Sequence, residues 1–115
     1  DVTGFGLAGH LLGLCEASDL AAILDLSAVP MMRGAIELSA QGIRSSLFED
    51  NRSLAPNLAR GPEADLLFDP QTAGGLLASV DADTADELLE QLQAAGYSAA
   101  RIGDLTSGAP ELTLR

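Results

Sequence analysis

Segments with helical spacing of apolar residues alternate with short apolar runs along this chain, and the alternation limits what it can fold into. A helix buries one apolar stripe, whereas a short apolar run between turn residues is typical of a strand. Helices spaced between strands imply an α+β fold, with a mixed or antiparallel sheet layered with helices. The sequence predicts helices over 4–17, 31–41 and 81–96, strands over 20–26, 64–68, 75–80, 98–105 and 111–114, and a long loop over 44–63 with room for a helical turn.

The first and last predicted helices differ in their surfaces. The segment over 4–17 carries a stripe of glycines as well as an apolar stripe, so it packs tightly on a sheet or lies beside a ligand or partner domain. The segment over 81–96 carries the clearest amphipathic pattern, and Gly96 ends it. Its predicted buried stripe consists of Ala85, Leu88, Leu89, Leu92 and Ala95.

The size of the chain is sufficient for one domain with a core. It has 115 residues, and we expect residues 1–115 to form a single domain. Only 3% of the residues are aromatic, so leucine and alanine must fill most of that core. One cysteine excludes an internal disulfide, which fits a reducing compartment such as the cytoplasm.

The charge balance excludes several classes of partner. The net charge is −11, from 17 acidic and 6 basic residues, and every basic residue is arginine. Such a surface repels nucleic acid and anionic membranes. No apolar run approaches the roughly 20 residues that span a bilayer. An acidic domain still handles a nucleotide when a divalent metal supplies positive charge, but a lysine that grips phosphate must come from elsewhere.

Two single residues are candidates for chemistry and are explained more simply by packing. His10 is the only histidine and lies among leucines and glycines, where a packed or hydrogen-bonded role is commoner than catalysis. Cys15 lies in the apolar stripe of the first helix with no basic neighbour in sequence, so we expect an inert buried thiol.

Two glycine-containing segments are the remaining candidates. We call residues 1–6, DVTGFG, the N-terminal motif, and residues 69–75, DPQTAGG, the Gly-Gly loop. A carboxylate beside a helix start can share Mg²⁺ with a bound anion, although Asp1 or Thr3 can equally be a plain helix N-cap. Backbone N–H groups of the Gly-Gly loop can form an anion-binding nest, although a wide turn between two strands explains the same residues.

Together, these two segments resemble the C-terminal half of selenide, water dikinase (selenophosphate synthetase). This enzyme belongs to the superfamily of aminoimidazole ribonucleotide synthetases. The middle segment PMMRGAIELSAQGI with Asn51 beyond it, and the end ARIGDLTSGAPELTLR, are also similar to that family. The resemblance covers essentially the whole chain. It implies the α+β C-terminal domain of a larger enzyme, and the abrupt start at Asp1 is then a cut within the longer protein.

The resemblance also implies which residues line the site. Asp1 matches a Mg²⁺ ligand of the family, while Thr3, Gly4 and Gly6 match residues that shape the turn and aim this carboxylate. In the Gly-Gly loop, the residues matched to the active-site cleft are Gln71, Thr72, Gly74 and Gly75. Cys15 does not match the catalytic position of the family. The catalytic cysteine or selenocysteine, its lysine and most metal-binding aspartates would lie upstream, so this chain contains no catalytic residue.

For the intact protein, the resemblance implies a cytoplasmic enzyme that makes selenophosphate from selenide, ATP and water and releases AMP and phosphate. Mg²⁺ is the implied cofactor, and the absent N-terminal domain would supply most of the ATP site and mediate homodimerisation. The isolated chain should be inactive. Two alternatives stay open: another ATP-using enzyme of the superfamily, such as a thiamine-phosphate kinase or a purine synthetase, or a non-catalytic interaction module.

Overall fold

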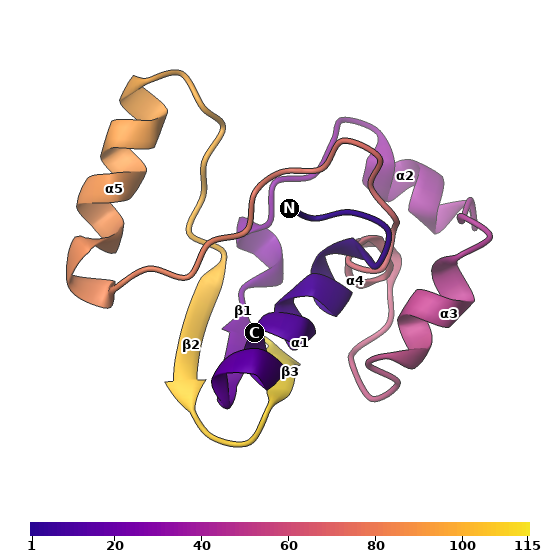
Figure 1. Ribbon diagram of the computed structural model, residues 1–115. Coiled ribbons are helices and arrows are strands. Elements are labelled where there is room, and N and C mark those ends of the chain that lie inside the picture. The colour runs from indigo at the N-terminus through magenta and orange to yellow at the C-terminus, as the bar shows by residue number, and fades with distance from the viewer.

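The computed structural model describes all 115 residues as an α+β fold around a three-stranded mixed sheet, which confirms the predicted class (Figure 1). The strand order is β2-β1-β3, and the central strand β1 is antiparallel to β2 and parallel to β3. The elements in chain order are α1 (Gly6–Ser18), β1 (Leu20–Leu24), the 3₁₀ turn η1 (Leu26–Ala28), α2 (Ala35–Ala40), α3 (Phe48–Ser53), α4 (Pro62–Leu66), α5 (Ala82–Ala94), β2 (Gly103–Ser107) and β3 (Glu111–Leu114).

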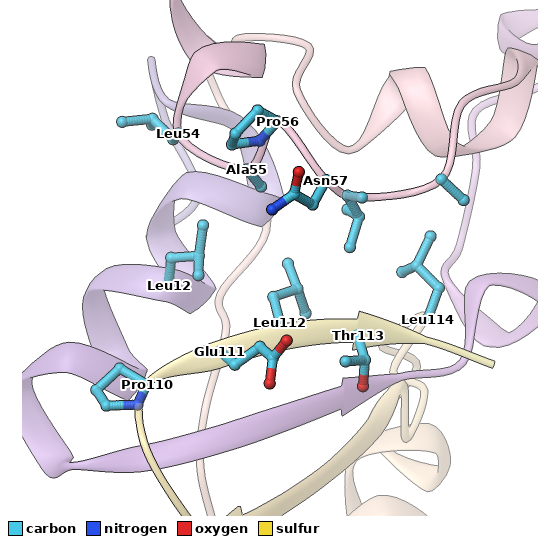
Figure 2. Close-up of a pocket in the computed structure, with 12 residues that line it drawn as sticks. Leu12, Leu54, Ala55, Pro56, Asn57, Pro110, Glu111, Leu112, Thr113 and Leu114 are labelled. Atoms are coloured by element: carbon cyan, nitrogen blue, oxygen red, sulfur yellow. The ribbon is translucent and has the colours of Figure 1, made fainter.

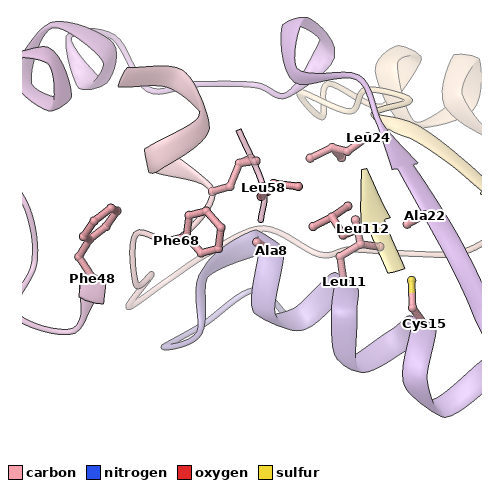
Figure 3. Close-up of a cluster of buried hydrophobic side chains, with 10 residues drawn as sticks. Ala8, Leu11, Cys15, Ala22, Leu24, Phe48, Leu58, Phe68 and Leu112 are labelled. Atoms are coloured by element: carbon pink, nitrogen blue, oxygen red, sulfur yellow. The ribbon is translucent and has the colours of Figure 1, made fainter. Parts of the chain in front are cut away.

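Helix α1 covers one face of the sheet. Alternate side chains of a strand point to the same face, and Ala22 and Leu24 of β1 are both buried on this side with their neighbour Leu112 of β3. They meet Leu11 and Cys15 of α1, as Figure 3 shows. The predicted first helix and the predicted strands over 20–26 and 111–114 are therefore confirmed, with small shifts in their ends.

The core continues beyond the sheet through two phenylalanines. Phe48 of α3 and Phe68 meet edge to face, with their ring centroids 6.4 Å apart (Figure 3). The guanidinium of Arg44 lies 4.9 Å from the centre of the Phe48 ring, and that of Arg52 lies 4.7 Å from the centre of the Phe68 ring. These contacting aromatic and arginine side chains join α3 and the segment after α4 to the layer formed by α1 and the sheet.

The structure corrects the prediction in the middle of the chain. The predicted strand over 64–68 is wrong, because Pro62 starts helix α4 and Glu63 and Asp65 lie in its first turn, where acidic side chains are favourable. The predicted loop over 44–63 contains helix α3 and the start of α4. The predicted helix over 31–41 is reduced to α2, which begins only after Gly34, a residue with a left-handed φ of 84°.

The second half contains two further corrections. The predicted strand over 75–80 is wrong, because this segment pairs with no strand and its Leu76 side chain is 87% exposed. The strand predicted over 98–105 forms later, as β2 (Gly103–Ser107). The helix over 81–96 is confirmed as α5, but none of its residues is buried, so the predicted buried stripe is wrong. Figure 1 shows α5 standing apart from the rest of the molecule.

Candidate functional site

The structure brings the N-terminal motif and the Gly-Gly loop side by side. The backbone N–H of Val2 donates to the carbonyl oxygen of Gly75 at 2.9 Å, and that of Gln71 donates to the carbonyl oxygen of Thr3 at 3.0 Å. Gly74 makes this approach possible, because a Cβ there would lie only 2.0 Å from the carbonyl oxygen of Val2. Two segments nearly 70 residues apart in sequence therefore form one continuous surface.

A glycine turn then leads from Asp1 into helix α1. Gly6 has a φ of 69°, which favours glycine, and a Cβ there would lie 2.6 Å from the carbonyl oxygen of Leu67. That same oxygen accepts the N–H of Ala8 at 2.9 Å. The start of α1 is thus pressed against the backbone just before the Gly-Gly loop, and Gly6 is the residue that permits it.

His10 holds the N-terminal motif from the α1 side. Its Nε2 accepts the backbone N–H of Thr3 at 3.0 Å and lies 3.1 Å from the Thr3 hydroxyl oxygen. An Nε2 atom that accepts an N–H carries no proton, so the proton of the neutral ring lies on Nδ1. His10 is therefore a hydrogen-bonded structural residue, as the sequence predicted.

The alternative in which Asp1 or Thr3 caps α1 is wrong. The residue at the N-cap position is Phe5, and no side chain accepts a hydrogen bond from the first turn. Asp1 and Thr3 are both exposed. Their side chains are accordingly not engaged in ending or starting the helix.

Asn51 of helix α3 holds the N-terminal motif through Gly4. Its buried carboxamide donates to the carbonyl oxygen of Gly4 at 2.8 Å and to that of Phe68 at 3.0 Å. Phe68 immediately precedes the Gly-Gly loop. Sequence reasoning named Asn51 only as part of the family resemblance and missed its contacts, because one asparagine in a segment expected to be a loop gives no sign that both of its N–H groups will be paired.

The Gly-Gly loop is partly tied down and partly open. The Gln71 side chain lies 3.3 Å from the backbone oxygen and from the carboxylate of Asp69. Thr72 and Gly75 are exposed, and nothing lies within 4 Å of a Cβ built on Gly75. The loop thus has a fixed base and an accessible end.

Asp1 can contribute to a metal site but cannot complete one in this chain. Its side chain is exposed, and no group of three or more histidine, cysteine, aspartate or glutamate residues is placed to hold an ion. Mg²⁺ in nucleotide sites is commonly bound by one or two carboxylates together with substrate phosphates. A single exposed carboxylate fits the role of one such ligand, and the remaining ligands would have to come from other groups.

Cys15 is fully buried beneath the sheet, as predicted. Burial is the larger cause of the raised pKa of its thiol, and the charge of Glu16 adds to it. A thiol with a raised pKa is a poor nucleophile, so Cys15 belongs to the core.

A separate hollow of about 420 Å³ lies between β3 and the segment 54–59 (Figure 2). Leu12, Leu112 and Leu114 point toward it. Glu111 is its only ionisable lining residue, and neither the N-terminal motif nor the Gly-Gly loop contributes to it. This hollow is therefore distinct from the candidate site.

Among the helices of this structure, none combines the length and the apolar character that a membrane crossing requires.

Comparison with known families identifies the class of this domain. Residues 1–114 match the model of the C-terminal domain of AIR synthase related proteins, so the chain belongs to this family.

Comparison with individual curated proteins shows which members of this family the chain resembles. The chain is 40% identical to a selenide, water dikinase of Myxococcus xanthus over 96% of its own length, and 38% identical to that of Pseudomonas straminea over 97%. It is also 36% identical to that of Nitratidesulfovibrio vulgaris over its full length. The predicted resemblance is confirmed. The chain spans only about a third of each relative (33%, 33% and 35%).

Proposed function

We propose that this chain is the C-terminal domain of a selenide, water dikinase and that its two motif segments form one wall of the nucleotide site. The observation that carries the proposal is the hydrogen-bonded pairing of the N-terminal motif with the Gly-Gly loop. The likeness to three proteins named selenide, water dikinase supports the assignment. The reaction of the intact enzyme is then the conversion of selenide, ATP and water into selenophosphate, AMP and phosphate.

In this proposal Asp1 is a Mg²⁺ ligand at the edge of the site. Bound Mg²⁺ neutralises the charge of the polyphosphate. Thr3, Gly4 and Gly6 hold the turn that aims the Asp1 carboxylate, since the Thr3 carbonyl accepts N–H groups from both Gly6 and Gln71. The exposed end of the Gly-Gly loop, with Thr72 and Gly75, faces the phosphates, and Gln71 and Gly74 fix its base.

The charge of the chain supports a shared site. With 17 acidic residues and no lysine, this domain cannot balance a polyphosphate by itself. In the proposal, a further N-terminal domain supplies the lysine, the nucleophile and the remaining metal ligands, and it mediates homodimerisation. The enzyme of this proposal acts in the cytoplasm, because a chain with a single free cysteine fits a reducing compartment.

The test is the variant Asp1→Asn in the intact enzyme, with Asp83→Asn as the matched control. Both changes remove one exposed carboxylate and keep the side-chain size, but Asp83 lies in the first turn of the projecting helix α5. We expect Asp1→Asn to lower selenide-dependent ATP turnover by roughly 10-fold or more and to raise the Mg²⁺ requirement, because a metal ligand is lost. Asp83→Asn should behave like the unmodified enzyme.

The alternatives predict different outcomes. Unchanged turnover and Mg²⁺ requirement in Asp1→Asn would contradict its role as a ligand. ATP turnover that depends on another acceptor instead of selenide would favour a different enzyme of the AIR synthase related family. An intact protein that consumes no ATP with any acceptor would favour an interaction module.

A further inference from the structure

Asn51 is the one side chain that donates both to the N-terminal motif and to the residue directly before the Gly-Gly loop. Both N–H groups of its carboxamide are used, one on the carbonyl oxygen of Gly4 at 2.8 Å and one on that of Phe68 at 3.0 Å. Gly4 belongs to the N-terminal motif, and Phe68 leads directly into the Gly-Gly loop. With only 4% of its surface exposed, Asn51 has no access to water that could replace these bonds.

The neighbours of Asn51 fix where its carboxamide lies. Three residues earlier, Phe48 packs edge to face against Phe68. The next residue, Arg52, has its guanidinium carbon 4.7 Å from the centre of the same Phe68 ring and donates to the backbone carbonyls of Ala55 and Leu58. Helix α3 is short, but these buried contacts on either side of Asn51 hold it against the segment that ends at Phe68.

The pair of acceptors is matched by the two N–H donors of an uncharged amide at this position. Two carbonyl oxygens from separate segments face one group, so that group must supply two donors. An aspartate has none when ionised and would place a buried negative charge against two oxygens. An alanine supplies no donor, so the Phe68 oxygen is left buried and unpaired, and the part-buried Gly4 oxygen loses the same partner.

We propose that Asn51 is a positioning residue that sets the separation of the two motif segments, so that Asp1 and the Gly-Gly loop act on the same polyphosphate. This inference rests on the function proposed above. Asn51 does not touch the nucleotide or the metal in this account. It acts through the Gly4 carbonyl on the turn that carries Asp1, and through the Phe68 carbonyl on the entry to the Gly-Gly loop.

The experiment measures the Mg²⁺ dependence of the intact enzyme at saturating ATP and selenide for Asn51→Asp and Asn51→Ala. We expect kcat to fall and the half-saturating Mg²⁺ concentration to rise by about 10-fold, in line with the roughly 10–100-fold effect of residues that orient metal ligands. The matched control is Asn57→Asp, which makes the same chemical change at an exposed asparagine six residues along the chain.

A second control separates positioning from loss of stability. Leu112→Ala shortens a buried side chain of β3, which lies outside both motif segments, so it lowers the unfolding temperature and the folded fraction. Its half-saturating Mg²⁺ concentration should stay at the unmodified value. If Asn51→Ala loses stability to the same extent and also keeps that value, its role is structural only and the inference is wrong.

The outcome for Asp1→Asn separates a failure of the positioning role of Asn51 from a failure of the proposed function. If Asp1→Asn raises the Mg²⁺ requirement and both Asn51 variants leave it unchanged, the positioning role is overturned while the proposed function stands. If Asp1→Asn leaves the requirement unchanged, the metal role of Asp1 fails, and the inference for Asn51 fails with it.

Discussion

Two regions of this molecule contrast in how their apolar residues are used. We call residues 1–75 with 103–115 the body and residues 76–102 the arm. All buried residues lie in the body, including the core of α1, the sheet, α3 and the segment after α4. The arm contains α5 and no buried residue, and Figure 1 shows it projecting from the body.

The arm is attached mainly at its two ends. Leu77 and Ile102 pack against the core of the body, and the Ile102 carbonyl accepts the N–H of Asp25 at 2.8 Å. Between these points, the polar contacts of α5 stay within the arm, where Asp86 lies 3.5 Å from Arg101 and the Gln93 amide donates to the Ala99 carbonyl. An amphipathic pattern thus predicts a helix, whereas burial requires a partner surface as well.

The largest expected difference in the free energy of unfolding comes from comparing the same leucine-to-alanine change in the body and in the arm. Leu24→Ala removes a side chain that is 1% exposed on the central strand, so it should lower the free energy of unfolding by about 2–5 kcal/mol. Leu92→Ala removes one that is 37% exposed on α5, so it should change that energy by no more than about 0.5 kcal/mol. Urea denaturation of each variant measures both values.

The same two variants can also contradict the contrast between the body and the arm. If Leu92→Ala costs as much as Leu24→Ala, then α5 is packed against a surface of the molecule in solution. The contrast between body and arm would then be wrong.

A smaller effect is expected from adjacent glycines at the junction of the two regions. Gly74→Ala places a Cβ 2.0 Å from the Val2 carbonyl oxygen, so the N-terminal motif and the Gly-Gly loop must separate. We expect a loss of about 1–3 kcal/mol, typical of overpacking, and faster amide hydrogen exchange at Val2 and Gln71, whose N–H groups donate from one motif segment to the other. Gly75→Ala meets no atom within 4 Å and should change neither quantity. Equal behaviour of the two variants would show that the segments are not in contact.

The sequence predicted the first helix, the first strand and the last strand better than the middle of the chain, because the signals of these three elements are local. The glycine-containing first helix, the run over 20–26 and the final strand are each short patterns with clear ends, and all three form. The run over 64–68 was misread because five apolar and acidic residues fit a strand or a helix equally, and Pro62 decided in favour of the helix. The run over 75–80 depends on pairing with another strand, which no local pattern specifies.

The candidate site was predicted as two separate segments, and their pairing required the fold. The pattern DVTGFG indicated a turn before a helix, and the structure shows that Gly6 makes this turn against the Leu67 carbonyl. The hydrogen bonds from Asn51 could not be predicted, because they depend on where α3 packs. The roles of Asp1 and of the Gly-Gly loop toward a ligand stay predictions.

The smallest expected effect on stability comes from Asp104, which lies where the arm leads back into the sheet. Asp104 of β2 accepts hydrogen bonds from Arg101 at 2.7 Å and from Arg115 at 3.0 Å, and these bonds lower the pKa of its carboxyl below the usual value of 3.8. A lowered pKa in the folded state means that the ionised carboxylate stabilises the fold above about pH 3.8, and that this contribution is lost as the pH falls through the folded-state value. Because the group is exposed to solvent, salt and water weaken the contribution.

Urea midpoints measured from pH 7 down to pH 2 test this for the unmodified chain and for Asp104→Asn. The unmodified chain should be the more stable of the two at pH 7, and the difference should shrink below about pH 3.8. Asp83→Asn, in the exposed first turn of α5, should show no comparable convergence, because that carboxylate has no arginine partner among the ion pairs of the structure. A constant difference between Asp104→Asn and the unmodified chain across this range would mean that the charged cluster does not fasten the arm to the sheet, and that Leu77 and Ile102 hold it by apolar contact alone.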